Sequence, residues 1–177
     1  MSIDMRQFQQ TFFAESAEGL DVMESGLLAL QPAALDSETI NAIFRAAHSI
    51  KGGAGTFGFE ALQRTTHLLE NLLDYTRRGE LALRRDIVDT FLEAKDMLND
   101  QLDAYRQGGE PDPEALERIC ETLRRLALEE LGEDAGVDAP AAPEPVVEQP
   151  MVAQSGGPDA GLLYTSPSPR DRQKTGM

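Results

Sequence analysis

The recurrence of apolar residues at helical spacing constrains the fold more than any other feature of the chain. It continues with short interruptions from about Asp4 to Leu131. Apolar side chains at i, i+3, i+4 and i+7 lie on one face of an α-helix, and no stretch alternates apolar and polar residues as a half-buried strand does. Breakers and caps divide the pattern into five predicted helices, at about Asp4–Leu30, Ser37–Phe57, Phe59–Arg78, Asp86–Tyr105 and Pro113–Leu131.

The breaks between these helices contain residues suited to helix ends. Pro32 ends the first helix, and Asp36 can cap the N–H groups that open the second. Gly79 suits the left-handed position after the third helix, while Asp112 and Pro113 form the start of the fifth. Short loops between long amphipathic helices favour antiparallel neighbours. We therefore predict an all-α fold, an up-down four-helix bundle with a fifth helix packed alongside. Periodicity does not decide which helix is the extra one, although the last is the natural candidate.

Composition changes at about residue 131. The stretch from Glu129 to Glu148 holds seven acidic residues and neither Lys nor Arg, and the residues from 132 onward show no helical periodicity. Such a stretch buries too little apolar surface to offset its ordering entropy. We predict a folded domain over 1–131, a flexible acidic linker rich in Ala and Pro over 132–160, and a disordered, foreign tail over 161–177.

Charge and cysteine content exclude several classes of protein. The 31 acidic and 16 basic residues give a net charge of -15, which argues against nucleic acid or anionic lipid as the main partner. The single cysteine, Cys120, excludes an internal disulfide and a cysteine-based zinc site. No apolar run approaches the roughly 20 residues that span a bilayer, and the N-terminus does not resemble a signal peptide. We expect a soluble, cytoplasmic protein.

One segment of the second helix departs from helix preferences. It contains Gly52, Gly53 and Gly55, each of which costs about 0.5–1 kcal/mol relative to Ala inside a helix. These glycines could simply mark the end of the helix. Alternatively, helical spacing places Gly52 and Gly55 on the same face as His48, with Lys51 beside it. The segment would then present an imidazole and a cation with no bulky side chain in the way of a partner. A phosphate-binding P-loop is excluded because its G-x-x-x-x-G-K-[ST] order is absent.

The third helix offers groups that could support His48. His67, Glu70 and Asp74 lie on its polar face, with Glu70 at the edge of the apolar arc. A carboxylate that accepts the Nδ1–H of His48 would fix the tautomer and leave Nε2 to act as the nucleophile. Spacing alone equally allows a solvated helix face, and a histidine with no role. No metal site is expected, because His67 precedes Glu70 in the reverse of the Glu-x-x-His order and no second pair exists.

Residues 41–59, NAIFRAAHSIKGGAGTFGF, closely resemble the phosphorylation-site helix of histidine phosphotransfer (HPt) domains. More specifically, they are similar to the N-terminal domain of chemotaxis sensor kinases of the CheA family. Residues 10–13, 66–74 and 101–105 resemble the same family. The resemblance covers residues 1 to about 131 and does not reach the tail.

This resemblance implies a five-helix HPt fold and a set of site residues. His48 would be the phosphoacceptor and Glu70 the group that hydrogen-bonds and orients it, with Lys51 and His67 in the same polar network. Gly52, Gly53 and Gly55 are the residues that we expect to give a partner access.

The resemblance also implies partners. A separate ATP-binding domain of a dimeric histidine kinase, usually that of the other subunit, would phosphorylate His48, and ATP and Mg²⁺ would bind there. No cofactor is expected in this segment, and we expect the segment alone to be a monomer. An aspartate of a response regulator, CheY or CheB, would then receive the phosphoryl group. A phosphotransfer module of another two-component relay, or a non-catalytic helical adaptor, is the alternative.

Overall fold

The structure is a computed structural model that describes residues 2–31 and 33–132. Its elements, in chain order, are α1 (Ser2–Ala29), α2 (Ser37–Phe57), α3 (Glu60–Arg77), α4 (Arg85–Arg106) and α5 (Pro113–Leu131). The five predicted helices and the all-α class are confirmed, with ends shifted by only one or two residues. Beyond Gly132, the predicted linker and tail lie outside the described residues.

Local side-chain chemistry fixes several helix ends. The Asp36 carboxylate accepts the backbone N–H of Glu38 at the start of α2, and Asp112 accepts that of Glu114 at the start of α5. Gly58 and Gly79 have φ values of 72° and 77°, which L side chains rarely adopt. The α2 helix runs through Gly52, Gly53 and Gly55 to Phe57 and is capped by Gly58, so the helix does not stop at these glycines, although they lie in its last two turns.

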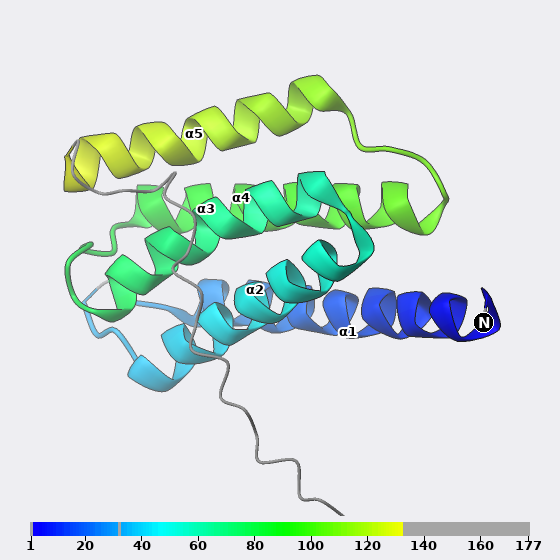
Figure 1. The fold of residues 1–177 in the computed structure, drawn as a ribbon. Helices are drawn as coiled ribbons and strands as arrows, with labels where there is room; N and C mark the ends of the chain where they lie inside the picture. Colours follow the sequence, from blue (N-terminus) through cyan, green and yellow to red (C-terminus); the bar gives the residue numbers. More distant parts are fainter. Residues whose placement is uncertain (1, 32, 133–177) are drawn as a thin grey trace, which may run out of the picture. The chain divides into compact units, whose positions relative to one another are not determined.

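Helices α1 to α4 form the bundle, and each helix runs antiparallel to the one before it (Figure 1). The α2 helix packs against both α1 and α3, and α4 packs against the same two helices. The α5 helix packs on α3 and α4, on the side of the bundle away from α1. It is therefore the extra helix, which periodicity had left open.

The core is formed where the apolar faces of the helices meet. Its largest fully buried side chains include Leu20 and Met23 of α1, Ile43 of α2, Leu69 of α3 and Phe91 of α4. These positions belong to the apolar stripes that define the helices in the sequence, so burial of each stripe stabilises the arrangement. Within the described part of the chain, no helix is long and apolar enough to cross a membrane.

Aromatic side chains pack around the turn that joins α2 to α3. The Phe59 ring stacks on Tyr105 of α4 with centroids 4.3 Å apart, and on Phe13 of α1 at 5.5 Å. The Tyr105 hydroxyl accepts the backbone N–H of Ala61 at 3.1 Å, in the first turn of α3. These contacts hold the start of α3 against α1 and α4, and so set how the later turns of α3 face α2.

Candidate functional site

A cluster of His48, Lys51 and Glu70 lies between α2 and α3. The Nδ1–H of His48 donates to Glu70 Oε1 at 2.8 Å, and Lys51 Nζ lies 2.7 Å from Glu70 Oε2. Both carboxylate oxygens therefore meet a partner from α2. The structure brings together three of the four residues that the sequence predicts for the polar network.

Burial differs strongly among the members of this cluster. The Glu70 side chain is 8% exposed and that of Lys51 17%, whereas the His48 side chain is 41% exposed. Hydrogen bonds to an ionised group are stronger where water is excluded. The structure thus anchors the Nδ1 edge of the imidazole in the α2–α3 seam and leaves part of the ring at the surface.

Helix geometry explains why two residues of α2 reach one carboxylate. His48 and Lys51 are three residues apart, so their side chains project from the same face of α2. Glu70 lies in the middle of α3 among buried leucines, at the edge of the apolar arc that packs on α2. A residue at that edge can reach across the seam while its carboxylate stays out of the apolar core.

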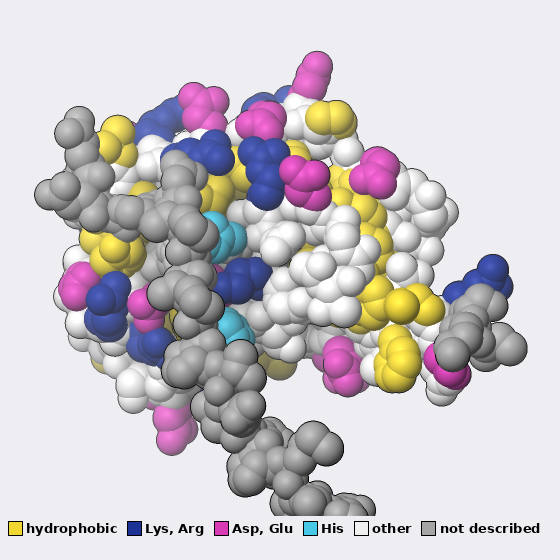
Figure 2. Space-filling model, viewed as in Figure 1, with side chains coloured by type: hydrophobic (Ala, Val, Ile, Leu, Met, Phe, Trp, Pro, Cys, Tyr) yellow, Lys and Arg dark blue, Asp and Glu magenta, His cyan; other side chains and the backbone are white. Residues whose placement is uncertain are grey.

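His67, the fourth predicted member of the network, lies one turn before Glu70 on α3. Its Nε2 is 3.5 Å from Asn71 Nδ2 on the following turn. Figure 2 shows both histidine side chains on one face of the molecule, beside basic side chains. Within residues 2–31 and 33–132, no three His, Cys, Asp or Glu side chains are grouped as the ligands of a metal ion would be.

Sequence reasoning missed two residues at this site, Phe44 and Arg77. Phe44 packs against the apolar core, as its place on the apolar face of α2 suggests, and its ring also stacks on His48 with centroids 6.1 Å apart. The guanidinium carbon of Arg77 lies 4.0 Å from the centre of the Phe44 ring. The available signal was spacing, because Phe44 lies one turn before His48 and Arg77 lies two turns after Glu70.

The three glycines expected to give a partner access have different surroundings. A Cβ atom at Gly52 would meet nothing within 4 Å, so the space beside this position is open. A Cβ atom at Gly53 would collide with the Phe12 ring of α1, and one at Gly55 would lie 3.1 Å from Gln63 Nε2. The absence of a side chain at Gly53 is therefore required by helix packing, a reason that helical spacing did not predict.

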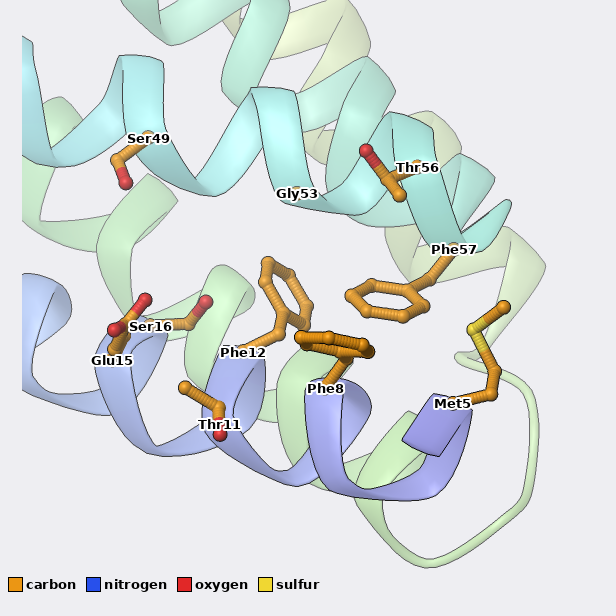
Figure 3. A pocket seen from close by; sticks show the side chains of 10 residues that line it. All are labelled: Met5, Phe8, Thr11, Phe12, Glu15, Ser16, Ser49, Gly53, Thr56 and Phe57. Atoms are coloured by element: carbon orange, nitrogen blue, oxygen red, sulfur yellow. The ribbon is translucent and has the colours of Figure 1, made fainter. Parts of the chain in front are cut away.

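Gly53 also borders a pocket between α1 and α2 (Figure 3). The pocket has a volume of about 470 Å³, and Phe8, Phe12 and Phe57 supply its aromatic lining. Ser49, the residue after His48, lines the same pocket. The α2 helix thus presents His48 at its α3 side and a small-residue face toward α1.

Gly52 and Gly53 provide a matched pair of alanine substitutions. Gly52→Ala is expected to raise the melting temperature, because a helical Ala is favoured over Gly by about 0.5–1 kcal/mol and the space is open. Gly53→Ala is expected to lower it, because overpacking against Phe12 costs about 1–3 kcal/mol and outweighs the same gain. Thermal unfolding followed by circular dichroism measures both. Equal shifts in the two variants would contradict this packing account of Gly53.

Comparison with known proteins supports a family assignment. The model of the Hpt domain family matches residues 7–108. The chain is 54% identical over 159 residues to the chemotaxis protein CheA of Salmonella typhimurium, and 57% identical over 158 residues to that of Klebsiella aerogenes. Each alignment covers 89% of this chain and 24% of the relative, so the chain spans about a quarter of the length of these relatives. Both alignments are longer than the 131 residues to which the resemblance was expected to extend, so the sequence similarity continues past residue 131 and that expectation is wrong.

Two solved structures share the fold of this chain. The crystal structure of the phosphorylated P1 domain of CheA3 in complex with CheY6 from R. sphaeroides is 27% identical, with a TM-score of 0.62 over 68% of this chain and 96% of that one. The solution structure of the histidine phosphotransfer domain of CheA is 32% identical, with a TM-score of 0.60 over 68% and 91% of the two chains. With the family model matching more than half of its residues and the bundle shared with these domains, this chain belongs to the Hpt domain family.

Proposed function

We propose that this chain is the phosphoryl-carrier segment of a chemotaxis histidine kinase, with His48 as its phosphoacceptor. The observation that carries the proposal is the 2.8 Å hydrogen bond from His48 Nδ1 to the buried carboxylate of Glu70. Because an ionised carboxylate can only accept a hydrogen bond, the neutral imidazole would carry its proton on Nδ1 and its lone pair on Nε2. An oriented imidazole that keeps part of its surface exposed is suited to accept a phosphoryl group from one protein and give it to another.

The proposed reaction uses Nε2 twice. In the first step Nε2 forms a bond to the γ-phosphorus of ATP while the bond from that phosphorus to the β–γ bridging oxygen breaks, and ADP leaves with the electron pair. Throughout both steps Nδ1 keeps its proton and donates it in the hydrogen bond to Glu70. In the second step a carboxylate oxygen of an aspartate attacks the phosphorus, the N–P bond breaks and its electron pair returns to Nε2.

The neighbouring groups fit a carrier, since phosphoryl transfer depends mainly on positioning and charge stabilisation. Glu70 positions the ring, and Lys51 places a cation on the same carboxylate. The open space over Gly52 allows a partner to approach α2 closely. In this proposal ATP and Mg²⁺ are bound by a separate kinase domain, so no residue of this chain holds either.

The proposed partners follow from the relatives. The chain matches 24% of the length of the chemotaxis proteins CheA, so the ATP-binding domain belongs to the remainder of such a protein, which we propose to be a dimeric cytoplasmic kinase. One structural neighbour is phosphorylated and bound to CheY6. By analogy, we propose that a response regulator of the CheY or CheB type receives the phosphoryl group from His48.

A two-step labelling experiment tests the proposal. The chain is incubated with the kinase portion of a CheA protein that lacks its own Hpt domain, and with ATP labelled at the γ-phosphate. We expect acid-labile, base-stable label on the chain, and loss of that label within seconds to minutes after addition of a chemotaxis response regulator. A helical adaptor would take up no label. A module of another relay would be labelled only by a different kinase, and either result would refute the proposed function.

A further inference from the structure

Phe44 and Arg77 form a stack that ends at His48. The Phe44 and His48 rings lie 15° from parallel with centroids 6.1 Å apart, and the Arg77 guanidinium lies 4.0 Å from the Phe44 ring centre. Both distances are within the ranges of favourable aromatic and cation–π contacts. Arg77 is itself held by Asp74, whose Oδ1 lies 2.6 Å from Arg77 Nη2.

This stack continues the arrangement of the His48 cluster along the α2–α3 seam. Phe44, His48 and Lys51 occupy i, i+4 and i+7 of α2, and so form one stripe of that helix. The facing stripe of α3 has the same spacing, at Glu70, Asp74 and Arg77. Contacts cross the seam from Glu70 to His48 and Lys51, and from Arg77 to Phe44. Contacts between α2 and α3 therefore lie both before and after His48 along α2, at Phe44 and at Lys51.

The two kinds of contact restrain the imidazole in different ways. A hydrogen bond at Nδ1 fixes one edge of the ring but leaves rotation of its plane about the Nδ1···Oε1 direction. A nearly parallel neighbouring ring restricts that rotation, because turning the imidazole would disrupt the stacking. Reaction at Nε2 needs both, since the lone pair lies in the plane of the ring and must point at the incoming phosphorus.

We infer that Phe44, held in place by Arg77, is a positioning residue that sets the plane of the His48 ring for phosphoryl transfer. Arg77 acts through Phe44, which it covers, and Asp74 in turn orients Arg77. This inference deepens the proposed function and rests on it for its kinetic test. Its structural part, the orientation of the imidazole, can be measured without any transfer reaction.

Arg78 provides a matched control for Arg77. It adjoins Arg77 at the end of α3, its Nε lies 3.3 Å from Asp74 Oδ2, and its guanidinium lies 4.7 Å from the ring centre of Tyr75. Replacing either arginine with Gln removes the same charge, an ion pair with Asp74 and a cation–π contact. Only Arg77 touches the ring that stacks on His48.

The experiment compares Phe44→Leu, Phe44→Tyr, Arg77→Gln, Arg78→Gln and the double variant Phe44→Leu/Arg77→Gln in the full chain. For phosphorylation by an added kinase portion, we expect Phe44→Leu to lower kcat about tenfold with little change in KM for the chain. This lies within the roughly 100-fold that a misplacement of about 1 Å can cost. Phe44→Tyr should keep most of the parent rate, because tyrosine retains an aromatic ring that can stack on His48. Arg77→Gln should cause a smaller loss, Arg78→Gln none beyond the effect of charge, and the double variant no more than Phe44→Leu.

Side-chain NMR couplings that report χ1 and χ2 of His48 supply the second readout. We expect a single conformation in the parent chain and averaged couplings in Phe44→Leu and Arg77→Gln, with circular dichroism showing that both variants keep the helical fold. Equal rates and couplings for Arg77→Gln and Arg78→Gln, together with an unchanged Phe44→Leu, would overturn the inference. If His48 accepts no phosphoryl group even in the parent chain, the proposed function fails, whereas the couplings still decide whether Phe44 and Arg77 hold the ring.

Discussion

His48→Gln is expected to fold like the parent chain and to acquire no acid-labile phosphate. The side chain is 41% exposed, so Gln replaces it with little loss of buried surface. The Gln amide can still donate to the Glu70 carboxylate, which keeps that buried group partnered. It offers no nucleophilic nitrogen lone pair, because that pair is delocalised into the carbonyl. The loss of labelling should therefore be complete, unlike the partial losses expected at the supporting residues.

Labelled ATP and the kinase portion of a CheA protein measure this loss, and circular dichroism checks the fold. His67→Gln is the counterpart, since His67 is the only other histidine of the chain and lies on the neighbouring helix. We expect His67→Gln to keep its label. Label that persists in His48→Gln and disappears in His67→Gln would transfer the phosphoacceptor role to His67.

Helix ends were predictable because their chemistry is local. Asp112 followed by Pro113 combines a capping carboxylate with a residue preorganised for the first turn, and the structure uses both. Gly79 adopts the left-handed conformation that its position in the sequence predicts. None of these features depends on a residue distant in the chain.

The continuation of α2 through the glycine segment could not be predicted from local helix preferences. Propensity alone permits the α2 helix to stop there, since each glycine disfavours the helical state. The helix continues to Phe57 because α2 packs on its neighbours, and Gly53 in particular allows the Phe12 ring to lie against the helix backbone. A residue 41 positions earlier in the chain thus supplies the reason for this glycine, which helical spacing does not reveal.

The candidate site was predictable in part for the same reason. His48 and Glu70 could be paired because each lies at the border between the polar and apolar faces of its helix. Phe44 was hidden by its membership of an apolar stripe, where an aromatic residue is ordinarily core. Arg77 was hidden because a basic residue in the last turn of a helix is already favoured by the helix dipole. Their contact depends on how α2 and α3 are aligned along the seam, and the sequence pattern leaves this alignment open.

Glu70→Ala is expected to slow phosphorylation of His48 by about 10²–10⁴-fold, the usual range for the loss of a positioned acid–base group. Without the carboxylate, Nδ1 loses its acceptor and the proton can move to Nε2, which removes the nucleophilic lone pair from that nitrogen in part of the molecules. Lys51 also loses its partner at Oε2. Transfer from phosphorylated His48 to the regulator should be affected less, because that step breaks the N–P bond and the regulator supplies the acceptor.

Glu70→Gln separates hydrogen bonding from charge. Its amide oxygen can still accept the Nδ1–H of His48, but it carries no charge to attract Lys51. We therefore expect a loss of rate between those of the parent and of Glu70→Ala, with the Nδ1–H tautomer largely retained. Nitrogen-15 shifts of the His48 ring report the tautomer, and a phosphorylation time course reports the rate. If Glu70→Ala changes neither, the carboxylate does not orient His48, and its contact with the ring is part of the packing between α2 and α3 alone.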